Sequence, residues 1–124
     1  MLESLLSKPE PPPHLDEMAR AIIGAAIEVH RRLGPGFLEA VYEESFVIEL
    51  QHRGISVARQ VPIKIFYRDR EVAEARLDLL VEHELVVEIK SVELLLPVQK
   101  KQLLTCLRLA DKRLGLFITQ CSKI

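Results

Sequence analysis

A chain of 124 residues is long enough for one domain with a buried core and too short for two, because domains usually contain roughly 100–150 residues. Apolar residues make up 48% of the chain and charged residues 28%, which excludes global disorder. The formal net charge of −1 argues against a tight nonspecific binder of nucleic acid. The charge is uneven, since residues 1–50 carry a net −5 and residues 51–124 a net +4, so a local basic surface is possible.

The cysteines and the apolar stretches exclude several other classes of protein. Cys106 and Cys121 form neither a CxxC motif nor a cluster with histidine, so we expect reduced thiols and no zinc site. The N-terminus has no basic segment ahead of an apolar one, and no stretch approaches the ~18 apolar residues of a membrane span. These features predict a cytoplasmic protein without membrane contact.

The start of the chain is rich in proline. Each proline removes a backbone donor and restricts the residue before it, so this stretch suits neither a helix nor a central strand. We therefore expect a flexible leader over residues 1–14, followed by a single domain over residues 15–124.

Two helices are expected before any strand. Apolar residues at helical spacing predict a first helix that begins near Asp16, a possible N-cap, and ends at Gly34. The second helix is expected to run from about Phe37 to the residue before Gly54.

Strands dominate the second half of the chain. They are expected at residues 61–67, 73–81, 85–91 and 114–119. Pro97 can open a helix that ends near Ala110 and separates the last two strands, which could then be parallel. The order ααβββαβ predicts an α/β fold with a small mixed sheet flanked by helices.

Two carboxylates and an ammonium group are expected to meet on one face of this sheet. If residues 82–84 form the turn of a hairpin, Asp78 lies opposite Glu88 with Cβ atoms ~5 Å apart. Lys90 shares the face of Glu88 because alternate residues of a strand point the same way. Like charges directly opposite destabilise a hairpin, so this pairing favours a cation between the carboxylates.

The donor set suits Mg²⁺ or Mn²⁺, because both ions prefer oxygen ligands and keep part of their water shell. The expected ligands are Asp78, Glu88 and the backbone carbonyl of Ile89. Lys90 could then orient the attacking water or offset charge that develops on a phosphate. The spacing alone also allows a surface ladder of salt bridges, in which Arg76 and Lys90 pair with the two carboxylates.

Residues 36–42, GFLEAVY, resemble the signature of the GxxExxY protein family, which is assigned to the PD-(D/E)XK nuclease superfamily. The resemblance covers about residues 17–119, and it is carried in order by residues 22–42, 59–62, 76–81, 87–90 and 102–104. It implies a PD-(D/E)XK nuclease-like, or restriction-endonuclease-like, fold.

The resemblance also implies roles for single residues. Asp78 matches the motif Asp of the superfamily, and Glu88 and Lys90 match its E-x-K. Glu39 matches an additional acid carried by a helix, although capping of that helix would also explain a carboxylate at its start. These four residues form the expected catalytic set.

Two further residues are expected to contact the substrate. Gln102 matches a glutamine that begins a Q-x-x-x-Y pattern in related nucleases, but here Cys106 stands in the place of the tyrosine. Tyr42 lies three residues after Glu39 on the same side of the helix, where its hydroxyl could bond toward the site or simply pack.

The sequence thus predicts a metal-dependent nuclease that hydrolyses phosphodiester bonds in DNA or RNA. The alternative is a non-catalytic module that retains the nuclease fold and binds nucleic acid or a protein. The near-neutral charge, the small size and Cys106 favour this alternative. Apolar residues in the leader, Leu2, Leu5 and Leu6, also allow a homodimer.

Overall fold

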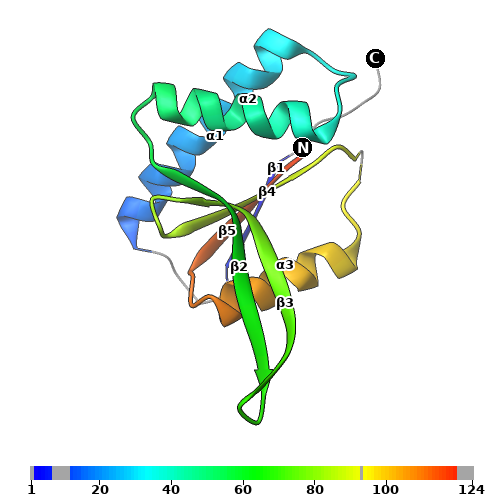
Figure 1. Ribbon diagram of the computed structural model, residues 1–124. Helices are drawn as coiled ribbons and strands as arrows, with labels where there is room; N and C mark the ends of the chain where they lie inside the picture. Colours follow the sequence, from blue (N-terminus) through cyan, green and yellow to red (C-terminus); the bar gives the residue numbers. More distant parts are fainter. Residues whose placement is uncertain (1, 7–11, 93, 120–124) are drawn as a thin grey trace.

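The computed structural model describes residues 2–6, 12–92 and 94–119. The elements are, in chain order, β1 (Leu2–Leu6), α1 (Pro13–Leu33), α2 (Glu39–His52), β2 (Val57–Tyr67), β3 (Arg70–Val81), β4 (Leu85–Lys90), α3 (Pro97–Leu109) and β5 (Leu114–Thr119). The strands form one sheet in the order β1-β5-β4-β3-β2 (Figure 1). β4 and β5 are parallel and the other neighbours are antiparallel, so the sheet is mixed. The α/β fold and the order ααβββαβ are confirmed from α1 onward.

The start of the chain differs from the prediction, because β1 lies within the expected leader. The prolines that disfavour a strand begin at residue 9, and residues 2–6 contain none. β1 pairs with β5, whose outer edge would otherwise present unpaired N–H and C=O groups. The first helix also begins earlier than expected, since Pro13 occupies its first turn and Asp16 lies inside that turn instead of at the N-cap.

Helices cover both faces of the sheet. α1 and α2 pack on one face, where their buried side chains form a first cluster with residues of β3, β4 and β5, among them Leu79, Val87 and Leu116. α3 packs on the other face, where a second cluster contains Leu103 and Phe117. The result is three layers, helices on sheet on helix.

β3 changes the face to which its side chains point at Asp78. Leu79 belongs to the first cluster, whereas Leu77, two residues away, belongs to the second. A regular strand would place both on one face. The neighbouring strand is irregular at the same level, because Gln60 has a positive φ of 51° and is missing from the pairing with β3, although Arg59 and Val61 on either side are both paired.

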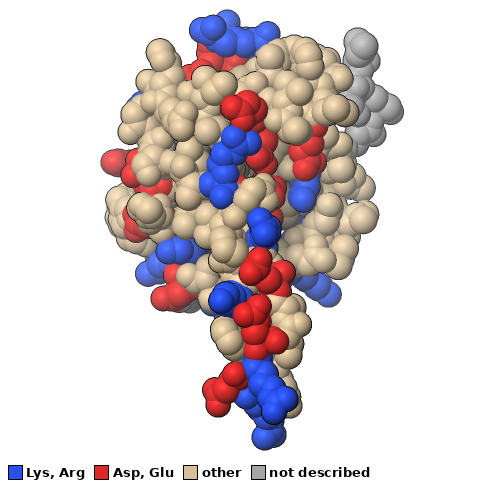
Figure 2. All heavy atoms as spheres, in the orientation of Figure 1, with Lys and Arg blue, Asp and Glu red and all other residues tan. Residues whose placement is uncertain are grey.

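Two tight turns define the β-hairpins. Arg68 and Asp69 join β2 to β3 with φ values of 48° and 67°, and residues 82–84 join β3 to β4, with φ values of 52° at Glu82 and 61° at His83. Left-handed residues at both central positions are typical of hairpin turns that match the twist of the strands. Residues 61–77, from β2, β3 and the turn between them, form a long ribbon, here called the arm, whose far end extends beyond the body of the protein (Figures 1 and 2).

A glycine sets the distance between α3 and the sheet. A Cβ atom at Gly115 of β5 would lie 3.1 Å from Leu103 and 3.2 Å from Leu107 of α3. Such contacts are tighter than ordinary side-chain packing, so the absence of a side chain lets the helix approach closely. Within the described part of the chain, no helix combines the length and the apolar character needed to cross a membrane.

Alanine substitution of Leu77 and of Leu79 tests the change of face at Asp78. Both leucines are buried, so each replacement should lower the free energy of unfolding by ~2–5 kcal/mol. Because the leucines belong to different clusters, their effects should add to within ~0.5 kcal/mol in the double variant. Urea denaturation of the wild type, both single variants and the double variant measures these quantities. A coupling energy well above ~1 kcal/mol would contradict the change of face.

Candidate active site

The expected acidic pair lies where the β3–β4 ladder ends. Pairing runs from Val81 opposite Leu85 to Leu79 opposite Val87, which confirms the predicted register, and it stops there. Instead of pairing with the backbone of β4, the backbone N–H of Asp78 donates a hydrogen bond to Glu88 Oε2 at 2.9 Å. The two carboxyl groups therefore occupy the gap between the strands.

The exchange is reciprocal, because the backbone N–H of Ile89 donates to Asp78 Oδ2 at 3.3 Å. In an antiparallel pair the N–H and the C=O of one residue point to the same side, so the carbonyl of Ile89 is also directed toward β3. The missing pair between Gln60 and Asp78 has the same origin, since the N–H of Asp78 turns toward Glu88 and away from β2. Each carboxylate thus compensates a donor that the sheet leaves unpaired.

Burial and repulsion make Glu88 a weak acid. Loss of water around its carboxyl group, together with the nearby charge of Asp78, raises the pKa of Glu88 to about 8. The predicted alternative of a salt-bridge ladder is wrong for the described residues, because neither carboxylate forms an ion pair with Arg76 or Lys90. Arg76 instead lies 3.6 Å from Glu74.

Lys90 shares a small cavity with Glu88, as the alternation of β4 predicts. This cavity has a volume of about 90 Å³, and Gln102 and Phe117 also line it. The charge of Lys90 favours ionisation of Glu88, but the effect is smaller than those of burial and of Asp78. The lysine therefore lies close enough to influence the carboxylate without pairing with it.

Glu39 lies at the start of α2 and contacts the end of β4. Its Oε2 accepts a hydrogen bond of 3.0 Å from the backbone N–H of Ser91, the residue after Lys90. Among the described residues, no three acidic, histidine or cysteine side chains gather closely enough to hold a metal ion, so Glu39 does not join the acidic pair. Its contact instead fixes the end of the strand that carries Lys90.

Tyr42 has a structural position. Its side chain is 1% exposed, and its hydroxyl donates to the carbonyl of Gly34 at 2.6 Å and accepts from the N–H of Phe37 at 3.3 Å. These bonds hold the loop between α1 and α2, which begins with Gly34 at a φ of 73°. The expected substrate contact through Tyr42 is not supported, because the ring is enclosed and the hydroxyl is already engaged.

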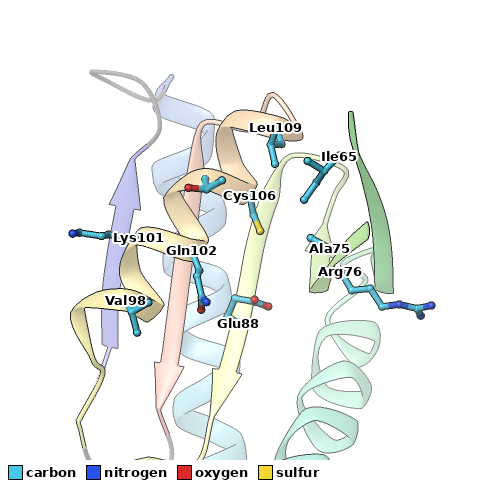
Figure 3. Close-up of a pocket in the computed structure, with 10 residues that line it drawn as sticks. Ile65, Ala75, Arg76, Glu88, Val98, Lys101, Gln102, Cys106 and Leu109 are labelled. Atoms are coloured by element: carbon cyan, nitrogen blue, oxygen red, sulfur yellow. The ribbon is translucent and has the colours of Figure 1, made fainter. Parts of the chain in front are cut away.

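Gln102 and Cys106 project from α3 toward the strand that carries Glu88 (Figure 3). Together with Glu88 they line a groove of about 440 Å³ between α3 and the arm. Burial and the charge of Glu88 raise the pKa of the Cys106 thiol. The thiol therefore stays protonated and lines the site as an uncharged group. Sequence reasoning noted Cys106 only as a departure from a motif, and it missed Gln99, which also lines the smaller cavity. Helical spacing from Gln99 to Gln102 could have indicated it.

The chemistry of this donor set fits a small divalent cation. Two carboxyl groups and the carbonyl of Ile89 supply the oxygen ligands that Mg²⁺ and Mn²⁺ prefer. Mg²⁺ is commonly held by one or two carboxylates together with water and phosphate, so Asp78 and Glu88 suffice for it. A cation between them would also remove the repulsion that raises the pKa of Glu88.

A mixed sheet between helices, with an acidic pair and a lysine on two neighbouring strands, defines a nuclease-like α/β protein. The family model described as the PD-(D/E)XK nuclease superfamily matches residues 16–122, and the chain belongs to this superfamily. No match was found among curated proteins or among solved structures. Membership establishes the fold, whereas the chemistry depends on the side chains that occupy the site.

The raised pKa predicts how stability depends on pH without metal. The folded protein retains the proton of Glu88 up to a pH of about 8, whereas the unfolded chain loses it near 4.5. The contribution of Glu88 is therefore fully present below the lower pKa and is lost as the pH rises through the higher one. Glu88→Gln keeps an acceptor for the N–H of Asp78 but cannot ionise.

Thermal melting in EDTA at a series of pH values should show this difference. The two proteins should melt at similar temperatures near the lower pKa, and the wild type should fall below Glu88→Gln as the pH approaches the higher one. A change of ~1 kcal/mol corresponds to a shift of roughly 4 °C for a domain of this size. Parallel pH profiles of the two proteins would contradict the burial and repulsion assigned to Glu88.

Proposed function

We propose that this protein is a Mg²⁺- or Mn²⁺-dependent nuclease that hydrolyses phosphodiester bonds in DNA or RNA. The observation that carries the proposal is the pair Asp78 and Glu88, held against each other where the ladder ends. Nothing about a stable sheet requires two facing carboxyl groups, and burial together with their repulsion raises the pKa of Glu88. A carboxyl group that has a raised pKa and lies beside a groove, as Glu88 does, is typical of an active site.

The residues of the site have two separate roles in this proposal, binding of the cation and stabilisation of the phosphate. Asp78, Glu88 and the carbonyl of Ile89 would hold the cation. Its chemistry is polarisation of the phosphoryl group and a lower pKa for the attacking water. Lys90, in the same cavity as Glu88, would orient that water and offset charge on the phosphate.

Gln102 and Glu39 have supporting roles in this proposal. The amide of Gln102 faces the groove beside Glu88 and can donate to a phosphate oxygen or to a base edge (Figure 3). Glu39, bonded to the N–H of Ser91, would act as an accessory acid that positions the strand end next to Lys90.

We further assign the chain to the GxxExxY protein family and place it in the cytoplasm.

A non-catalytic module that binds nucleic acid or protein is the second candidate. Cys106 favours it, because a thiol replaces the phenol that continues the Q-x-x-x-Y pattern in related nucleases and lies against Glu88. The separation of Glu39 from the acidic pair favours it as well. A cleavage assay with a metal-binding readout distinguishes the two functions.

Mn²⁺ or Mg²⁺ should support slow cleavage of at least one of single- or double-stranded DNA or RNA. EDTA should abolish this activity, and Lys90→Ala should lower it by ~10²-fold or more because charge on the phosphate is no longer offset. Lys112→Ala is the matched control, because this lysine donates to the carbonyl of His83 at the far end of the same hairpin. Equal cleavage by Lys90→Ala and wild type would reveal a contaminating nuclease. Binding without cleavage by the wild type would favour the second candidate.

Metal binding should reverse the order of stability of wild type and Asp78→Asn. In EDTA the variant should be at least as stable as wild type, because asparagine keeps an acceptor for the N–H of Ile89 and removes the repulsion. With Mn²⁺ at a hundredfold excess over its Kd, wild type should gain ~2.7 kcal/mol and the variant much less. Melting of both proteins with Mn²⁺ and with EDTA measures this. A variant that is less stable under both conditions, with no Mn²⁺ shift in wild type, would eliminate the metal site.

A further inference from the structure

The arm, which extends from the body of the protein (Figures 1 and 2), carries exposed aromatic side chains at its tip. Phe66 and Tyr67 are 59% and 66% exposed, and Val72 on the facing strand is 61% exposed. The ladder shifts between Ile65 and Phe66, which leaves Val72 without a paired residue. Aromatic rings on a ribbon with no core beneath them add little to stability, so they suit an external partner.

Arginines frame these rings. The guanidinium of Arg68 lies 5.8 Å from the centre of the Tyr67 ring, and Arg70 pairs directly across from Tyr67. Among the residues that the structure describes, neither arginine forms an ion pair, whereas Lys64 and Arg76 on the same arm pair with glutamates. Asp69 lies between the two arginines in the turn, and Glu71 is paired with Lys64. Arg68, Asp69 and Arg70 therefore give the tip a net charge of +1 (two basic side chains less one acidic one) beside its stacking surfaces.

The groove of the candidate active site continues onto the inner side of the arm. Ile65 and Ala75 line it from the arm, and Val98 and Leu109 line it from α3 (Figure 3). Glu88 lines the same groove, so a ligand bound along it would contact the arm and the acidic pair together. The walls are mostly apolar, which suits the faces of unpaired bases better than a hydrated duplex backbone.

The geometry points to the tip of the arm as a binding site for a single-stranded stretch of the nucleic acid that the acidic pair acts on. Bases would stack on Phe66 and Tyr67, and phosphates would lie beside Arg68 and Arg70. This inference rests on the proposed function for the identity of the ligand as nucleic acid. Seven residue steps of β2 separate the level of Gln60 from Tyr67, which is a distance of ~23 Å.

Charge favours a nucleic acid over a second copy of this chain. In a symmetric dimer that buried the two tips against each other, the net positive charge that Arg68, Asp69 and Arg70 give to each tip would repel that of the other copy. A polyanion complements the same arginines. The uneven charge of the sequence agrees, because residues 51–124 carry a net +4 in a chain whose total is −1.

A tip variant and a control on the same arm test the inference. The tip variant combines Phe66→Thr, Tyr67→Thr, Arg68→Asn and Arg70→Thr, since threonine retains strand propensity and asparagine tolerates the φ of 48° at residue 68. The control combines Lys64→Thr and Val72→Thr, which remove a paired cation and an aliphatic side chain. Affinity for a fluorescent DNA strand is measured by anisotropy in EDTA over a range of salt concentrations.

The tip variant should bind at least ~10-fold more weakly than wild type, since each lost stacking contact alone can account for that factor. Its slope of log affinity against log salt should fall by about 1.4, because two phosphate contacts are removed from a single strand. The control should bind like wild type.

Equal binding by the tip variant and wild type would overturn the inference, and so would a wild type that binds no strand. A wild-type dimer that the tip substitutions separate without a change in DNA affinity would overturn it in favour of a contact between copies. The two readouts distinguish the inference from the proposed function, because affinity in EDTA tests the tip, whereas cleavage with Mn²⁺ tests the acidic pair. Tip-dependent binding by a wild type that cleaves nothing would support the inference and contradict the nuclease.

Discussion

The contact between Asp78 and Glu88 places two acidic groups side by side where little water reaches them. Such a contact persists only if backbone donors, a proton or a cation compensate it. Here each carboxyl group accepts from the backbone of the opposite strand, and β3 must open its ladder on both sides to supply those donors. The early end of the β3–β4 pairing, the missing pair with Gln60 and the change of face in β3 are consequences of this one requirement.

The central part of the sheet could be predicted because its determinants are local. The polar residues 82–84 allow one tight turn, and the turn sets which residues of β3 and β4 face each other. The parallel pairing of β4 with β5 follows from the helix between them. β1 could not be predicted in the same way, because its pairing joins residues 2–6 to residues 114–118 and leaves no periodic signal nearby.

The acidic pair was accessible from sequence for the same local reason, whereas its surroundings were not. Alternation along a strand places Lys90 on the face of Glu88. The bonds of Glu39 to Ser91 and of Tyr42 to Gly34 depend on how α2 docks against its neighbours, which no spacing along the chain expresses. The resemblance to known nucleases pointed to both residues, but it could not separate a group that faces the substrate from one that holds a loop.

The absence of a side chain at Gly115 affects the access of solvent to the site as well as the packing of α3. Leu103 and Leu107 lie only 3.1–3.2 Å from where a Cβ atom would be, and the same turns of α3 carry Gln102 and Cys106, which line the groove with Glu88. The separation between helix and strand thereby limits how much solvent penetrates the site. Because every electrostatic interaction weakens as the local dielectric constant rises, a glycine outside the lining of the site determines how strongly the charges within it act on one another.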